Sequence, residues 1–123
     1  MNADFKITSE QIQAEGKEPV TIFNLQGWLD AQSEGKLLSA ALEAQNAGTR
    51  HLILNLENVD MLTSSGIRVM LSIHQLFNLS DNSSGVRLCN PQPNVYHVLK
   101  LTGFLQTMPV YESLQAALDS YPK

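Results

Sequence analysis

The chain has 123 residues, 43% hydrophobic and 16% charged, which is the composition of an ordinary soluble globular protein long enough for one domain with a core. Its eight lysines and arginines are scattered against twelve acidic residues. The net charge of -4 and the lack of a basic stripe exclude a typical nucleic-acid binder and disfavour an anionic membrane surface. A single cysteine excludes an internal disulfide, and with no signal-peptide pattern and no apolar stretch near the roughly 20 residues of a membrane span, we expect a cytoplasmic location without direct membrane insertion.

The first elements predicted along the chain are two strands that form an antiparallel hairpin. Residues 5–12 alternate moderately between apolar and polar side chains, as an edge strand does. Residues 20–25 are rich in β-branched and aromatic side chains, which favours a second strand, and Gly27 is expected to close it. The polar segment 13–19, which contains glycine and proline, predicts the turn between the strands.

A helix and a buried strand are expected next. Residues 33–45 change to helical spacing, and Asp30 or Ser33 is placed to cap the start. Gly48 is placed where a helix commonly ends. One face of this helix is expected to carry Leu38, Ala41, Leu42 and Gln45. Residues 51–56 are almost continuously apolar, which is typical of a strand covered on both faces.

The second half of the chain alternates helices and strands. Residues 66–79 predict a well-buried helix, because apolar side chains such as Met70 and Leu71 follow helical spacing. The remaining predicted elements are a loop at 78–85, a strand at 86–89, a helix from Pro93 to near Gly103, a short strand within 104–110 and a helix at 112–121. This order implies parallel strand pairs with right-handed crossovers. We therefore predict an α/β fold, a mixed β-sheet of four to five strands with about four helices packed against it.

Thr63, Ser64, Ser65 and Gly66 separate the buried strand from the following helix. In α/β sheets, ligands and chemistry collect at this carboxyl edge of the strands. The first turn of a helix has free backbone N–H groups and the positive end of the dipole, so a phosphate on a serine there would be stabilised. The residues alone also permit a structural interpretation, in which Ser64 or Ser65 caps the helix and Gly66 eases the turn.

Residues 33–36 match S-x-x-K without its companion motifs, which we interpret as a chance match, and no other catalytic, metal or nucleotide motif is found in the sequence. There is no G-x-S-x-G, G-x-x-x-x-G-K-[ST] or H-E-x-x-H, and no cluster with metal-ligand spacing. His51, His74 and His97 are interpreted as structural histidines, and Cys89 as an inert core thiol. We therefore predict no catalytic residue, no metal and no cofactor.

The central segment, residues 51–71, reads HLILNLENVDMLTSSGIRVML. It resembles the central segment of STAS domains, named for sulfate transporters and anti-sigma factor antagonists, and most closely that of the bacterial antagonists. These have a strand of the type h-h-h-N/D-h, a loop ending D-S-S-G-L, and then a helix. Three further segments agree in order and spacing: residues 25–30 with L-x-G-x-h-D, 86–91 with the fourth strand and turn, and 99–104 with L-x-x-[ST]-G-h. The resemblance covers about residues 4–120, which implies one STAS domain within residues 1–123.

The resemblance implies a partner switch controlled by phosphorylation. An ATP-dependent serine kinase that is also the anti-sigma factor binds the unphosphorylated antagonist and so releases the sigma factor. The kinase phosphorylates the first serine of S-S-G, which is Ser64 here, and a serine phosphatase resets the switch. The implied partner surface is the helix beginning at Gly66 with the loops at the same edge. Its residues here would be Asp30, Ser33, Thr63, Ser64, Ser65, Gly66 and Arg68.

Thr63 stands where the family commonly has an aspartate before the two serines. Aspartate is a charged acceptor and threonine is not, so Ser65 and Thr63 stay open as alternative phosphate acceptors to Ser64. A second hypothesis is a STAS binding module without phosphorylation, an accessory subunit of a transport or signalling complex, in which Ser64 only caps the helix. A third, a small serine hydrolase, has no supporting motif; under the first two the protein is not an enzyme.

Overall fold

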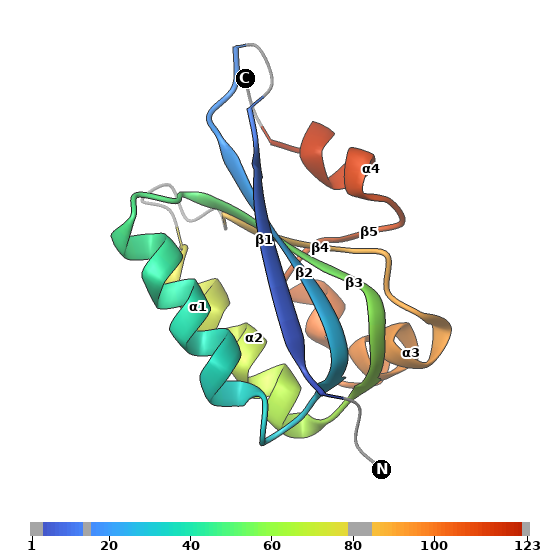
Figure 1. Cartoon of the computed structure of the whole chain (residues 1–123). Helices are drawn as coiled ribbons and strands as arrows, with labels where there is room; N and C mark the ends of the chain where they lie inside the picture. The colour runs from blue at the N-terminus through green and yellow to red at the C-terminus, as the bar shows by residue number, and fades with distance from the viewer. Residues whose placement is uncertain (1–3, 14–15, 79–84, 122–123) are drawn as a thin grey trace.

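The computed structural model describes residues 4–13, 16–78 and 85–121. Five strands form one mixed sheet in the order β1-β2-β3-β4-β5, with four α-helices packed against it (Figure 1). The elements are β1 (Lys6–Ile12), β2 (Val20–Leu29), α1 (Glu34–Asn46), β3 (His51–Leu62), α2 (Ser64–Leu76), β4 (Val86–Cys89), α3 (Pro93–Leu101), the 3-10 helix η1 (Phe104–Gln106), β5 (Val110–Tyr111) and α4 (Leu114–Asp119). β1 pairs antiparallel with β2, and the other neighbours are parallel. The predicted α/β fold is confirmed.

The core lies on both faces of the sheet, and the two parts differ in size. The larger part packs α1, α2 and α3 against one face, and the smaller part packs α4 against the other. Neighbouring residues of β3 contribute to opposite parts: Leu52 and Leu54 to the larger, Ile53 to the smaller. This explains the continuous apolar run of that strand, since side chains alternate between faces and both faces are covered.

β2 and β3 are longer than expected, and their ends carry the candidate site. Gly27 does not close β2; it lies inside the strand at φ 99°, beside a register shift between the two strands. A Cβ at Gly27 would come within 2.6 Å of the Asp4 carbonyl oxygen, so the close approach of the chain requires glycine. β3 continues past residue 56 to Leu62 because these irregularities let polar residues follow the apolar run without ending the strand.

The extended ends of β2 and β3 form a two-stranded ribbon beyond the rest of the sheet. β4 pairs only with residues 52–55 of β3. Side chains at the start of α3 bond to the far part of β3: Gln92 donates to the Glu57 carbonyl oxygen at 2.9 Å, and Asn94 donates to that of Asp60 at 2.7 Å. Beyond the residues of β3 that pair with β4, the start of α3 therefore bonds to β3 and holds the ribbon.

The helices differ from expectation in their faces and ends. α1 buries Leu37 and Ala41, whereas Leu42, expected on the buried face, is 40% exposed. α2 begins two residues earlier than predicted and ends at Leu76, and Leu71 points outward at 39% exposure. Gly48 follows the C-cap of α1 at φ 98°, as predicted. α4 is shorter than the predicted 112–121, and most of the predicted loop at 78–85 lies outside the described residues.

Within the three described ranges, no helix combines the length and the apolar character that crossing a membrane requires.

The amino ends of the central strands hold a buried polar cluster. His51 has a side chain only 7% exposed, and its Nε2 lies 2.9 Å from a carboxylate oxygen of Glu18. Its Nδ1 has no hydrogen-bond partner among the described residues. The Tyr121 ring packs 4.4 Å from the imidazole, and its hydroxyl donates to the carbonyl oxygens of Gly85 at 2.7 Å and Leu52 at 3.1 Å. Burial lowers the pKa of His51, against the opposing effect of Glu18.

Stability is expected to fall as the pH drops below 6.5, the ordinary pKa of histidine. Because the pKa of His51 is lowered in the folded state, the unfolded chain binds more protons there, so this contribution is complete above that pH and is lost on acidification. Urea unfolding at about pH 7.5 and about pH 5.5 measures how much the free energy of unfolding falls on acidification. This decrease should be smaller for His51→Gln than for the wild type. His97→Gln, which removes an exposed histidine of α3, is the control and should keep the wild-type loss. An undiminished loss in His51→Gln would contradict the assignment.

Candidate functional site

The candidate site lies where β2 and β3 end and α2 begins. Thr63 has extended backbone angles, and its N–H donates to the Leu29 carbonyl oxygen at 3.1 Å. Its own carbonyl oxygen accepts from the Ile67 N–H at 3.0 Å, which is the first hydrogen bond of the helix. The last residue of β2 thus holds the residue that joins β3 to α2, and this fixes the direction in which α2 leaves the sheet.

Gly66 lets α2 approach β2 more closely than any other residue would. It is buried, and a Cβ built on it would overlap the Leu29 carbonyl oxygen and lie 2.6 Å from Cδ1 of Leu62. The backbone φ is not positive, so the requirement is space and not conformation. The expectation that Gly66 eases the turn is therefore replaced: it lies inside the helix, at its contact with the sheet.

Ser64 and Ser65 do not cap the helix, contrary to the structural interpretation. Thr63 holds the N-cap position, and its side chain makes no capping hydrogen bond; its hydroxyl lies 3.4 Å from the Leu29 carbonyl oxygen. Ser64 is the first residue of α2 and is exposed, whereas Ser65 and Thr63 are half-buried. Within the described part of the chain, the amides of this helical turn thus have no capping side chain, and Ser64, the most exposed of the three residues, stands beside them.

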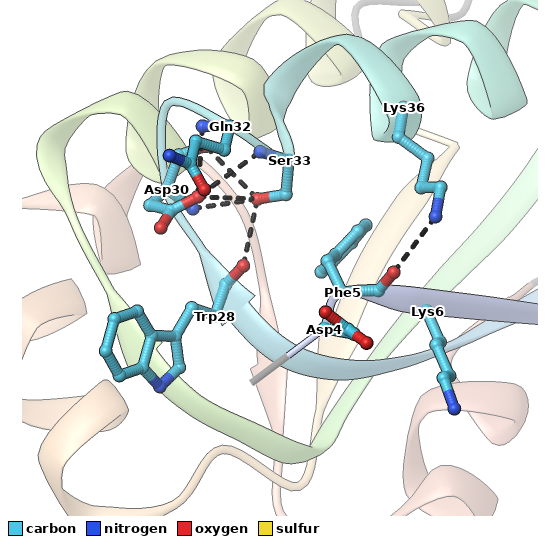
Figure 2. A pocket seen from close by; sticks show the side chains of 8 residues that line it. All are labelled: Asp4, Phe5, Lys6, Trp28, Asp30, Gln32, Ser33 and Lys36. Atoms are coloured by element: carbon cyan, nitrogen blue, oxygen red, sulfur yellow. Dashed lines mark hydrogen bonds between the residues drawn. The ribbon is translucent and has the colours of Figure 1, made fainter. Parts of the chain in front are cut away.

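The loop from Asp30 to Ser33 lies next to this junction and is held by its own side chains (Figure 2). Ser33 is 3% exposed; its hydroxyl accepts from the Asp30 N–H at 2.8 Å and donates to the Trp28 carbonyl oxygen at 2.9 Å. A carboxylate oxygen of Asp30 accepts from the backbone N–H groups of Gln32 at 3.0 Å and Ser33 at 3.2 Å. Ser33 occupies the N-cap position of α1 but makes no capping bond, so these two predicted site residues shape the loop.

A hollow of about 420 Å³ opens beside this loop (Figure 2). It is lined by Asp4, Phe5, Lys6, Trp28, Asp30, Gln32, Ser33 and Lys36. Lys36 reaches across it and donates to the Phe5 carbonyl oxygen at 3.0 Å, while the Trp28 ring is directed away from the network of Asp30 and Ser33. Acidic and basic side chains both line the hollow. The charged groups of Asp30 and Lys36 already make hydrogen bonds within the protein.

An ion pair joins Glu34, the first residue of α1, to Arg68 in the second turn of α2. Arg68 Nη2 lies 2.9 Å from one carboxylate oxygen of Glu34 and 3.5 Å from the other. The Arg68 side chain is 66% exposed and that of Glu34 is 30% exposed. Hydrogen bonding to Glu34 raises the pKa of Arg68. The structure therefore groups the predicted residues of α2 at one edge, and this pair connects them to the start of α1.

A chain of polar side chains crosses the sheet and was not predicted. Asn90 donates to Asn55 at 3.3 Å, Asn55 donates to Asn24 at 2.8 Å, and Asn24 donates to Glu10 at 3.2 Å. Asn24 and Asn55 are register partners, and each stands between two apolar residues of its strand. An asparagine at the same place in two predicted neighbouring strands is the signal from which these side-chain hydrogen bonds could have been predicted. The chain of side chains pins the register of the strands that carry the site.

The three residues considered next, Cys89, His74 and His97, were predicted to have structural roles, and they differ in burial. Cys89 is fully buried, and burial raises the pKa of its thiol to about 12, so the reactive thiolate is suppressed near neutral pH. His74 lies half-buried in the last turn of α2, and His97 is exposed on α3. None of these side chains lies at the junction of β3 and α2.

A protein-family model of the STAS domain matches residues 11–117 of this chain. The chain belongs to the STAS domain family. This STAS protein is 31% identical over 109 residues to the anti-sigma F factor antagonist of Paenibacillus polymyxa, across 88% of this chain and 92% of that protein. Its fold is similar to that of an anti-sigma factor antagonist from Mycobacterium paratuberculosis, with a TM-score of 0.75, 23% identity, and 94% and 93% of the two chains covered. It is also similar to the unphosphorylated anti-sigma factor antagonist SpoIIAA, with a TM-score of 0.72, 21% identity, and 93% and 94% covered. The predicted family is confirmed.

Proposed function

We propose that this STAS protein is an anti-sigma factor antagonist, a binding protein and not an enzyme, whose partner is an anti-sigma factor. Phosphorylation of Ser64 by an ATP-dependent serine kinase would switch the binding off, and a serine phosphatase would restore it. One observation carries the choice of Ser64: it is an exposed residue at the first position of α2, while Thr63 and Ser65 are half-buried residues. The similarity to an anti-sigma F factor antagonist along most of both chains supports the partner class.

The electrostatics of the junction support a switch at this position. A phosphate adds about -1.5 to -2 charges and three strong acceptor oxygens. At Ser64 it would stand beside uncapped amides at the positive end of the α2 dipole, which lowers the cost of the modified state within the protein. A partner that docks on this edge would face the same negative charge, and it would not gain from the α2 amides and dipole that stabilise the phosphate within the protein. The modification therefore weakens an interface without unfolding the domain.

The acceptor is tested by phosphorylation in vitro with the cognate kinase and ATP, followed by peptide mass spectrometry. We expect one phosphate on the wild type and none on Ser64→Ala. Ser65→Ala and Thr63→Val are matched controls that each remove one neighbouring hydroxyl, and both should be modified at Ser64. Phosphate retained on Ser64→Ala at either neighbour would contradict the assignment.

A STAS binding module without phosphorylation is the second candidate. The observation that favours it is Thr63, a neutral side chain whose hydroxyl is directed to the Leu29 carbonyl oxygen, where related antagonists commonly carry aspartate. A module of this kind would form part of a transport or signalling complex through the same edge. Its partner would bind Ser64→Asp as well as the wild type, and the kinase assay would leave all three hydroxyls unmodified.

A further inference from the structure

We propose that Arg68 is the phosphate-binding residue of the modified protein, and that a phosphate on Ser64 takes Arg68 from Glu34. The switch at Ser64 would then also break the ion pair between α1 and α2. This inference rests on the proposed phosphorylation of Ser64, and it adds a second residue and a second helix to that event.

Helix geometry places Arg68 within reach of a phosphate on Ser64. The two residues are four apart in α2, so their side chains are neighbours on one helix face, with Cβ atoms about 5–6 Å apart. Ser64 is exposed, and the Arg68 side chain is 66% exposed, so neither has to leave a packed environment to meet the other. A guanidinium fork also matches the oxygens of a phosphate better than a single-point cation does.

The phosphate competes with Glu34 from a stronger position. Glu34 offers Arg68 one negative charge from another helix, at 2.9 Å. The phosphate would offer up to two charges and three acceptor oxygens from the same helix. It would also repel the Glu34 carboxylate, because both groups are negatively charged and would lie close to the same guanidinium. Arg68 should therefore turn from α1 to the phosphate.

Glu34 can lose Arg68 without becoming a buried, unpaired charge. Its side chain is 30% exposed, and it is the first residue of α1, where the helix dipole stabilises a carboxylate. The modified surface would thus present two new negative features to a partner: the phosphate on α2 and an uncompensated carboxylate on α1. Glu34 directly follows the loop that carries Asp30, and Ser64 directly follows Thr63, whose N–H donates to Leu29 at the other end of that loop.

The test places phosphoserine at position 64 by genetic encoding and follows the phosphate by phosphorus NMR during a pH titration. If Arg68 binds the dianion, Arg68→Gln should raise the second pKa of the phosphate by about half a pH unit relative to the phosphorylated wild type. Arg68→Lys should retain part of the effect. Glu34→Gln, which removes the competitor, should lower this pKa or leave it unchanged. Arg50→Gln is the control, because it removes an exposed arginine paired with Glu18 at the opposite end of β3.

The exchange itself is measured with a double-mutant cycle of Arg68→Gln and Glu34→Gln in urea unfolding. The two residues should be coupled in the unmodified protein and uncoupled when Ser64 carries the phosphate. Equal phosphate titrations in the wild type and Arg68→Gln, or a coupling that survives phosphorylation, would overturn the inference. Since no kinase is used, the absence of enzymatic modification at Ser64 would count against the proposed function alone.

Discussion

Replacing Gly66 by alanine is expected to destabilise the protein by about 1–3 kcal/mol, the usual cost of forcing extra atoms into a packed site. The added methyl group would overlap a backbone carbonyl oxygen, that of Leu29, which cannot turn away as a flexible side chain does. That oxygen also accepts the N–H of Thr63, so moving it would loosen the junction of β3 and α2. The cost should therefore appear in both the free energy of unfolding and the position of Ser64.

Urea unfolding followed by circular dichroism measures this effect. Gly35→Ala is a matched control: it lies in α1, is exposed, and has no described atom within 4 Å of the added methyl group. Since alanine favours a helix over glycine, Gly35→Ala should be neutral or more stable by up to about 1 kcal/mol. A midpoint for Gly66→Ala equal to that of the wild type would show that the contact with Leu29 is not tight.

Placing negative charge at Ser64 is expected to weaken binding of the anti-sigma factor by about 30- to 150-fold, which corresponds to about 2–3 kcal/mol. A docked partner would exclude water around the start of α2, and the new charge would then lack both solvent and a cation from the partner. The loss should be largest for phosphoserine and smaller for Ser64→Asp, which carries less charge. Ser64→Ala should bind as the wild type does.

Isothermal titration calorimetry with the purified partner distinguishes a local effect from a change in net charge. Ser39→Asp is the control, since it adds the same charge at an exposed position of α1 away from the junction. It should retain wild-type affinity within a few-fold. Equal losses for Ser39→Asp and Ser64→Asp would assign the effect to overall charge, and no loss for phosphoserine 64 would contradict the proposed switch.

The sequence predicted the elements well where the pattern of apolar residues depends on local structure. The runs that became β1 and β4 were located to within one residue. β4 is a short apolar run that is mostly buried, and β1 is an exposed edge strand with moderate alternation. The ends of β2 and β3 were missed, since Gly27 and the polar residues after Asn55 resemble strand ends but form irregular pairs within the sheet. The predicted buried face of α1 began at Leu38, whereas the structure buries Leu37. Both leucines lie in the same turn, and helical spacing alone did not distinguish them.

The candidate site was predictable as a location, whereas its contacts were not. A strand followed by Thr63 and Ser64 and then a helix indicates a carboxyl edge, and that part needs only local signals. The burial of Ser33, the overlap that excludes a side chain at Gly66 and the pair of Arg68 with Glu34 each depend on residues about 30 or more positions away, or on the exact course of a loop. Such contacts follow from packing between elements and leave no periodic trace.

The ribbon formed by the ends of β2 and β3 has a consequence for solubility. A strand that extends beyond its sheet presents unpaired backbone groups, to which a strand of another molecule can add. Here Gln92 and Asn94 occupy carbonyl oxygens of β3 at Glu57 and Asp60, so the amides of α3 fill positions that an incoming strand would need. Loss of these two amides would therefore favour aggregation through the edge of β3, at the end of the molecule where we propose that a partner binds.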